Sequence, residues 1–423
     1  MTAEIAVMNK YGIALAADSA VSIGTGKIYN SANKLFALTK FHPVGVMVYG
    51  NAHFMGIPWE TIIKEYRLTV LKGRQLPSIV EYMEEFLEFL SRSPMFTDAG
   101  ETEFMQRFAA ITLMELVDSI KERVADVIRQ DGKISDVQTE QLVNKLVKEW
   151  LDLQNEAPAG FPRGMRSTLD RKYGKKVDEI SNDLFQALPI NRRLLSGVRK
   201  ALLDGVGRKS NTLSPSGLVI AGFGEREFFP SVSSVRIDGK IGRYLRILKQ
   251  NVQSVRHDNT AVIVPFAQRE MVDLFMRGID PQLQSAIYDA VGNILEKMDE
   301  RLALRANINL DEKTRAVIAE QMTKIHTTLF ERLENIQNRK FVRPVLSGVA
   351  ALPLDELAAM AESLVNLTTF KRRVTPVQES VGGPVDVAVI SKGDGFIWIK
   401  RKHYFSPELN PHFFRQFSGK EAV

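Results

Sequence analysis

Apolar segments of strand length lie at both ends of this chain of 423 residues, and long helical segments lie between them. Strands at both ends can belong to one core only if they share its sheets. The helical segments must then leave that core and return to it. We therefore expect an α+β protein, in which antiparallel sheets pack together and are covered by helices. Separate helical and β domains are the alternative.

The expected strands are short apolar runs that turn signals separate. Tyr11-Gly12 separates the first two runs, so we expect them to form a hairpin of core strands. Gly393-Asp394-Gly395 separates the last two runs in the same way. The pattern predicts strands within residues 5–8, 13–17, 35–38, 44–48, 218–221, 228–237, 261–264, 385–391 and 396–400.

Two blocks between the strands have helical periodicity, from residue 59 to about 205 and from about 270 to 367. Prolines and glycines divide the first block into roughly four or five expected helices. One of these helices should bury a face made of Phe104, Phe108, Ile111, Met114 and Val117. We expect a single domain of residues 1–423, with long helical insertions at about 70–212 and 270–370.

The composition excludes several classes of protein and site. Cysteine is absent, which excludes disulfide frameworks, thiolate zinc sites, Fe–S clusters and a cysteine nucleophile. The six histidines form no HxxxH pair, so we expect no metal and no other cofactor, with an oxygen-only metal site as the alternative. No run of eighteen apolar residues and no secretory signal is present, which predicts a cytoplasmic protein without a membrane span.

Thr2, Asp18, Lys34 and Gly50 are the residues near the N-terminus that suggest chemistry. Removal of the initiator methionine would make Thr2 the N-terminus, with a nucleophilic hydroxyl beside its own α-amine. The ordinary pKa of that amine is about 7.7–8.0, so it can accept the hydroxyl proton near neutral pH. The Lys34 ammonium would lower the pKa of the amine, and Asp18 would hold Lys34 charged and in place. Gly50 would offer its backbone N–H to an oxyanion.

The spacing of these residues resembles the beginning of a proteasome β-type subunit, and thus the bacterial proteasome-like N-terminal-nucleophile (Ntn) hydrolases. That family has an N-terminal threonine, a G-V-x-x-A-A-D-S strand, a lysine, and a strand that ends in glycine. The corresponding residues here are Thr2, the segment Gly12-Ile-Ala-Leu-Ala-Ala-Asp18-Ser19, Lys34 and Gly50. The offsets from Thr2 to Asp18 and to Lys34 match the family pattern without a gap.

The resemblance implies a four-layer αββα sandwich, in which two antiparallel sheets lie between two helical layers that are enlarged here. It implies a threonine-type peptidase that acts on peptides or unfolded proteins inside a self-compartmentalised, ring-like homo-oligomer. Thr2, Asp18, Lys34 and Gly50 would be the catalytic residues, and Ser19 would support them. A catalytically inactive scaffold subunit and a small-amide Ntn hydrolase are the alternatives.

The sequence departs from the family pattern in length and at one supporting pair. Family subunits are roughly half as long. The family's D-x-x-S pair, which steadies the nucleophile, is replaced in register by Gln378 and Val381, while Glu379 and Ser380 are shifted by one position. Gln378, Glu379 and Ser380 are thus the candidates for the supporting role, and the missing pair predicts slow turnover.

Residues 161–210 form the most basic segment, and they carry more net positive charge than the whole chain, whose formal charge is +6. We expect a solvated helical face here. A docking surface for an acidic partner is the alternative. The segment lacks interleaved aromatic residues, so it gives no specific indication of nucleic-acid binding.

Overall fold

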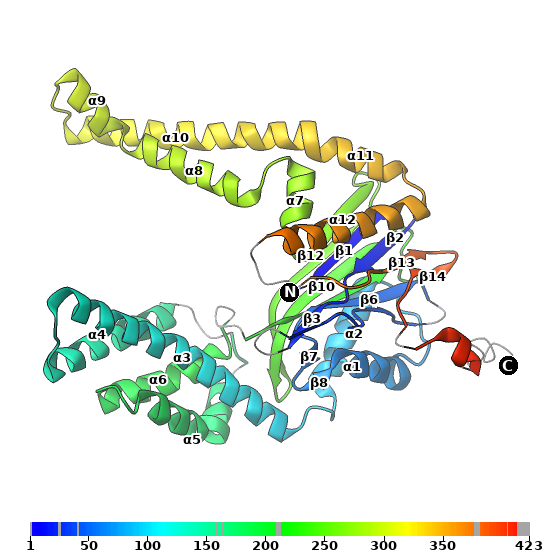
Figure 1. Ribbon diagram of the computed structural model, residues 1–423, viewed down its shortest axis with the longest axis horizontal. Helices are drawn as coiled ribbons and strands as arrows, with labels where there is room; N and C mark the ends of the chain where they lie inside the picture. Colours follow the sequence, from blue (N-terminus) through cyan, green and yellow to red (C-terminus); the bar gives the residue numbers. More distant parts are fainter. Residues whose placement is uncertain are drawn as a thin grey trace.

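The computed structural model describes residues 2–23, 27–39, 42–156, 160–162, 164–208, 213–375, 381–403 and 405–412. This part of the chain is α+β, and its main strands form two five-stranded antiparallel sheets. Figure 1 shows the sheets beside a helical lobe from the first half of the chain and a long helical arm from the second half.

The first sheet joins the two ends of the chain. Its strands, in spatial order, are β12 (Ala261–Ala267), β1 (Ala3–Asn9), β2 (Ile13–Ala17), β13 (Asp386–Ser391) and β14 (Gly395–Lys400). β1 and β2 form the predicted hairpin, with Val7 opposite Ala14. Both strands are buried along their whole length, because helices cover one face and the second sheet covers the other.

The second sheet is built from strands that lie between β2 and β12 in the chain. In spatial order these are β11 (Tyr244–Ser254), β10 (Ser231–Ile241), β9 (Ser216–Gly222), β6 (Val44–Gly50) and β5 (Leu35–Ala37). The sequence pattern did not predict β11, because most of its side chains are polar or only partly buried. Pairing with β10 over its whole length makes it a strand.

The two sheets pack face to face, and helices cover their outer faces. Because side chains alternate along a strand, every second residue points between the sheets, among them Met8, Leu15, Met47 and Val219. On the outside of the first sheet lie α11 (Arg343–Ala351) and α12 (Leu354–Val374). On the outside of the second sheet lie α1 (Trp59–Tyr66) and α2 (Ile79–Arg92).

A helical lobe with its own hydrophobic cluster follows α2. It contains α3 (Asp98–Asp131), α4 (Asp136–Glu156), α5 (Met165–Phe185) and α6 (Arg192–Gly205). The described residues between 59 and 205 thus contain six α-helices, one more than the upper expected number. The predicted face of α3 is wrong in part: Ile111 and Met114 are 38% and 51% exposed, while Met105 and Leu113 are buried. The buried face differs from the predicted one because α4 and α5 both pack on α3.

A helical arm follows the first sheet's edge strand. It consists of α7 (Glu270–Arg277), α8 (Pro281–Glu296), α9 (Met298–Ala306) and α10 (Glu312–Gln337), and α8 packs along α10. Figure 1 shows α8, α9 and α10 projecting away from the sheets. Neither α8 nor α10 has a buried residue, so both present apolar side chains to their surroundings.

Short elements complete the described structure. They are β3 (Val21–Ile23), β4 (Lys27–Tyr29), β7 (His53–Phe54), β8 (Ile57–Pro58), the π-helical segments η1 (Arg67–Leu71) and η2 (Asn338–Val342), and the 3₁₀ turn η3 (Pro407–Leu409). Within the described ranges, no helix combines the length and the apolar character that a bilayer crossing requires.

Candidate active site

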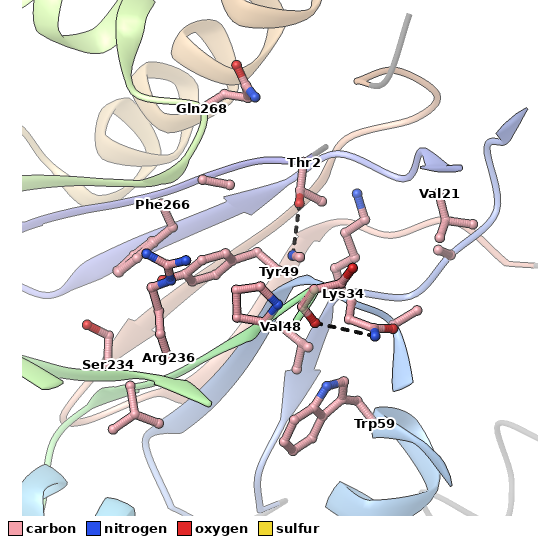
Figure 2. Close-up of a pocket in the computed structure, with 18 of the residues that line it drawn as sticks. Thr2, Val21, Lys34, Val48, Tyr49, Trp59, Ser234, Arg236, Phe266 and Gln268 are labelled. Atoms are coloured by element: carbon pink, nitrogen blue, oxygen red, sulfur yellow. Dashed lines mark hydrogen bonds between the residues drawn. The ribbon is translucent and has the colours of Figure 1, made fainter. Parts of the chain in front are cut away.

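Thr2 lies at the wall of a cleft of about 1170 Å³ between the two sheets. It directly precedes β1, and the alternation of this strand turns the side chains of Thr2, Glu4 and Ala6 toward the second sheet. Thr2 Oγ1 accepts a hydrogen bond from the backbone N–H of Gly50, with an N···O distance of 3.2 Å. Figure 2 shows the side chain of Lys34 pointing toward Thr2.

Asp18 connects separate chain segments behind Thr2. Its Oδ1 accepts hydrogen bonds from Lys34 Nζ at 2.7 Å and from the Ala3 N–H at 2.9 Å. Its Oδ2 accepts from the N–H groups of Ala20 at 3.2 Å and Gly382 at 3.0 Å. The carboxylate is fully buried, and these donors replace the water that it loses on folding. Asp18 therefore fixes both Lys34 and the start of β1.

Lys34 is a buried cation beside the Thr2 position, with a side chain that is 8% exposed. Burial lowers the pKa of Lys34, while the carboxyl groups of Asp18 and Glu4 act in the opposite direction. A positive charge in this position would favour the neutral form of an amine at Thr2. The position therefore suits a residue that keeps such an amine basic and unprotonated.

Gly50 has a conformation and surroundings that only glycine suits. Its φ is +80°, and a Cβ at this position would lie 2.3 Å from the carbonyl oxygen of Pro215. The residue ends β6 and presents its N–H to Thr2 Oγ1. If Thr2 Oγ1 bonded to the carbonyl carbon of a substrate, the carbonyl oxygen of that substrate would lie close to the Gly50 N–H, which is a fixed hydrogen-bond donor.

Glu4 is a buried carboxyl group in the site that the sequence interpretation missed. The residue is 2% exposed, and neither carboxyl oxygen has a hydrogen-bond partner among the described residues. The pKa of Glu4 is raised to about 8, chiefly by burial; the Lys34 charge acts to lower it and the Asp18 charge to raise it. A glutamate on the inward side of an otherwise apolar strand was the sequence signal that could have revealed it.

Tyr49 forms part of the cleft wall next to Glu4. Its ring stacks on Phe266 of β12 at a centroid distance of 5.8 Å, so these rings bridge the two sheets. Burial, with a smaller contribution from Glu4, raises the pKa of Tyr49 to about 12. The phenol is therefore neutral across the physiological pH range.

The proposed supporting residues are placed only in part. Ser19 is buried, and its Oγ donates a hydrogen bond to the Pro384 carbonyl, which anchors the loop before β13. Gln378, Glu379 and Ser380 lie outside the described residues. Val381 is buried in the cluster between the first sheet and α12. Within the described ranges, no group of three histidine, aspartate or glutamate side chains could hold a metal ion.

The basic segment forms α5, α6 and their flanks, and several of its cations have ion-pair partners. Lys172 pairs with Glu101 at 3.2 Å, and Arg199 pairs with Asp178 at 2.6 Å. Two of its cations, Arg163 and Lys209, lie outside the described residues. An acidic partner at this segment stays a prediction.

Comparisons with known proteins return two groups with different names, and no protein-family model matches the chain. The chain is 28% identical over 137 residues to eukaryotic translation initiation factor 3 subunit M of Drosophila grimshawi, which covers 32% of this chain and 34% of that protein. The same subunit of Drosophila mojavensis is 27% identical over 137 residues, with the same coverage. The chain thus spans about a third of the length of the curated relatives that it matches.

The similar solved structures are Anbu proteins. A mutant Anbu from Hyphomicrobium sp. strain MC1 has a TM-score of 0.30 and 10% sequence identity, and the match covers 100% of this chain and 99% of the Anbu chain. Anbu (ancestral beta-subunit) from Yersinia bercovieri has a TM-score of 0.28 and 9% identity over 99% and 95% of the two chains. The helical assembly of the Anbu complex from Pseudomonas aeruginosa has a TM-score of 0.29 and 12% identity over 99% and 93%. Similarities at this level assign no family, activity or partner to this chain.

These findings correct the identification made from the N-terminal motif. The solved structures are Anbu proteins, the curated relatives are initiation factor subunits, and neither group points to a proteasome β-type subunit. The expectation that the chain is a proteasome β-type subunit is therefore wrong. A motif of a few N-terminal residues covers too little of the chain to establish its family.

Proposed function

We propose that the protein is a threonine-type peptidase in which Thr2 becomes the nucleophile once Met1 has been removed. The observation that carries the proposal is the arrangement around Thr2 Oγ1. The hydroxyl accepts the Gly50 N–H, Lys34 lines the same large cleft, and the buried Asp18 pairs with Lys34. These are the parts that an N-terminal nucleophile requires: a hydroxyl, a base, a charge that tunes the base, and an oxyanion donor.

The proposed reaction uses the α-amine that removal of Met1 exposes. Thr2 Oγ attacks the carbonyl carbon of the substrate, and its proton moves to the α-amine. The new oxyanion accepts a hydrogen bond from the Gly50 N–H. The peptide C–N bond then breaks, and the proton on the α-ammonium passes to the leaving amine. Water hydrolyses the ester at Thr2 and restores the hydroxyl.

The dimensions of the cleft favour peptides over small amides. Pockets for small molecules commonly measure about 300–1000 Å³, and the cleft of about 1170 Å³ exceeds this range. The buried ion pair favours an enzyme over an inactive scaffold, because burying two charges costs more free energy than burying apolar residues of the same size. Asp18 would also fix the start of β1 in a scaffold, but a scaffold has no need of an ammonium group beside Thr2.

The proposal extends to architecture and assembly. Two sheets that pack together, with α11 and α12 on one outer face and α1 and α2 on the other, support a four-layer αββα sandwich of the Ntn type. We also propose one domain in which the lobe and the arm are insertions, and a homo-oligomer. The apolar side chains along α8 and α10 support the oligomer, because neither helix has a buried residue.

Labelling of the N-terminus tests the proposed function. Intact mass should show the loss of Met1, and a β-lactone or peptide boronate probe should label Thr2 in the wild type. Thr2→Ala should not be labelled, whereas a matched variant at a distant buried threonine of α3, Thr112→Ala, should be labelled normally. Retention of Met1, or equal labelling of Thr2→Ala, would refute the assignment.

A further inference from the structure

The cleft has a second wall that the proposed chemistry does not use. This wall is the face of β10 and β11 that points between the sheets. We call it the basic ladder, and its side chains are Ser234, Arg236, Lys249, Asn251 and Gln253. Figure 2 shows Ser234 and Arg236 on this wall together with Tyr49 of the same sheet, whereas Thr2 comes from the other sheet. The ladder and the nucleophile thus line the same cleft.

The register of the two strands places Arg236 directly opposite Lys249. Like charges in directly opposed positions destabilise an antiparallel pair. Neither cation has an ion pair with any described residue, and the side chains of Ser234, Asn251 and Gln253 make no hydrogen bond within the described ranges. Within the described ranges, the ladder therefore has two cations without an ion-pair partner and a row of unused hydrogen-bonding groups.

The charge of the surrounding cleft has the same sign. Arg107 of α3 and Arg269, which follows β12, also line it. Glu60 is the sole carboxylate among the described residues that line the cleft, and it is already bonded to Lys64 Nζ at 2.5 Å. Lys64 and Asn33 lower the pKa of Glu60 against the effect of its burial, so this carboxylate stays ionised and its charge is already paired with Lys64. An anion entering the cleft would meet a positive wall.

We propose that the basic ladder binds an acidic segment of a peptide substrate and that this segment leads to Thr2. The proposal rests on the proposed function in that the bound peptide is the one to be cleaved. Arg236 and Lys249 would pair with side-chain carboxylates of the peptide. Ser234, Asn251 and Gln253 would bond to its backbone groups, as amide and hydroxyl side chains can both donate and accept. Binding would also remove the repulsion between the two cations.

A peptide fits this wall better than a nucleic acid. Proteins that bind single strands combine basic side chains with aromatic rings on which bases stack. The aromatic rings of this cleft are not free for stacking, because Trp59 and Phe266 are buried and Tyr49 already stacks on Phe266. The unused groups of the ladder match carboxylates and peptide bonds.

Binding to a protein that cannot cleave tests the proposal. The probe is a fluorescein-labelled peptide of about ten residues that contains several glutamates, titrated into the Thr2→Ala protein and followed by fluorescence anisotropy. Matched peptides carry glutamine or lysine in place of glutamate. We expect the acidic peptide to bind at least about tenfold more tightly than the glutamine peptide at low salt. This preference should shrink as salt is added, because the ladder is open to solvent.

The variant Lys249→Glu, made in the Thr2→Ala protein, provides the sharpest test. It places a carboxylate opposite Arg236, which turns a repulsive pair into an attractive one, so the variant should fold at least as well. It should bind the acidic peptide about 10–100-fold more weakly, as expected for the loss of a charged hydrogen bond. Lys148→Glu changes an exposed lysine of α4 by the same charge, and it should bind the peptide normally.

The outcomes separate this inference from the proposed function. If Thr2 is labelled but the acidic peptide has no advantage, or if Lys249→Glu binds it normally, the ladder is not its site. Tighter binding of an RNA oligonucleotide that displaces the peptide would also overturn the inference, in favour of a nucleic-acid surface. If Thr2 is not labelled while Lys249→Glu loses the acidic peptide, the ladder stands and the proposed function fails.

Discussion

Replacing Glu4 with glutamine should change how the stability of the protein depends on pH. In the folded protein, burial raises the pKa of Glu4 from 4.5 to about 8. Between these two pH values, Glu4 binds a proton in the folded protein but not in the unfolded chain. The free energy of unfolding must therefore fall as pH rises through this window, by about 1.4 kcal/mol per pH unit for this group.

The expected loss follows from the two pKa values. From pH 5 to pH 7, the contribution of Glu4 to the free energy of unfolding should decrease by about 2.5 kcal/mol. Glutamine has nearly the same shape and does not titrate. Its amide N–H groups would be buried without partners at a cost of about 1–3 kcal/mol, but that cost does not vary with pH. The difference between the two proteins should therefore shift in favour of Glu4→Gln as pH rises.

Urea unfolding of the two proteins at several pH values between 5 and 8 measures this difference. An exposed glutamate of α2 provides the control, since Glu84→Gln should follow the wild type. An infrared band from a protonated carboxyl should be present in the wild type at pH 7 and absent from Glu4→Gln. If the difference in stability does not change with pH, and the band is missing, then Glu4 is ionised and the reasoning from its burial is refuted.

Three further predictions concern the site and the organisation of the chain. Lys34→Met should abolish labelling of Thr2 and destabilise the protein by about 3–5 kcal/mol, because it leaves the buried Asp18 carboxylate without its cation; normal labelling of the variant would contradict the role of Lys34. Gly50→Ala should lower the melting temperature more than Gly56→Ala, because both glycines have positive φ but only Gly50 meets a carbonyl oxygen; equal losses would contradict the clash. Limited proteolysis should release no stable folded fragment of about residues 77–205, because the lobe contacts the second sheet: the Arg246 guanidinium of β11 lies 4.8 Å from the ring centre of Phe108 in α3. Recovery of such a fragment would show a separate domain.

The order of strands and helices was predictable from the sequence because it depends on local patterns. Continuous apolar runs marked β1 and β2, and the turn residues between them predicted their pairing. The spacing of Asp18, Lys34 and Gly50 also follows from local structure, since Asp18 directly follows β2, Lys34 directly precedes β5 and Gly50 ends β6. In the structure Lys34 and Gly50 line one cleft with Thr2, and Asp18 is bonded to Lys34; their catalytic roles stay a prediction.

Other features depend on contacts between distant segments, and the tertiary structure alone decides them. β11 has little apolar periodicity, and it is a strand because β10 supplies its hydrogen-bonding partners. The same pairing places Arg236 opposite Lys249, which no pattern within either segment predicts. Glu4 has an unusual pKa because the packing of two sheets removes water from it and places Asp18 and Lys34 nearby. Local sequence determines which backbone conformation has the lowest free energy in each segment. Burial and electrostatic interactions depend instead on which distant segments pack together.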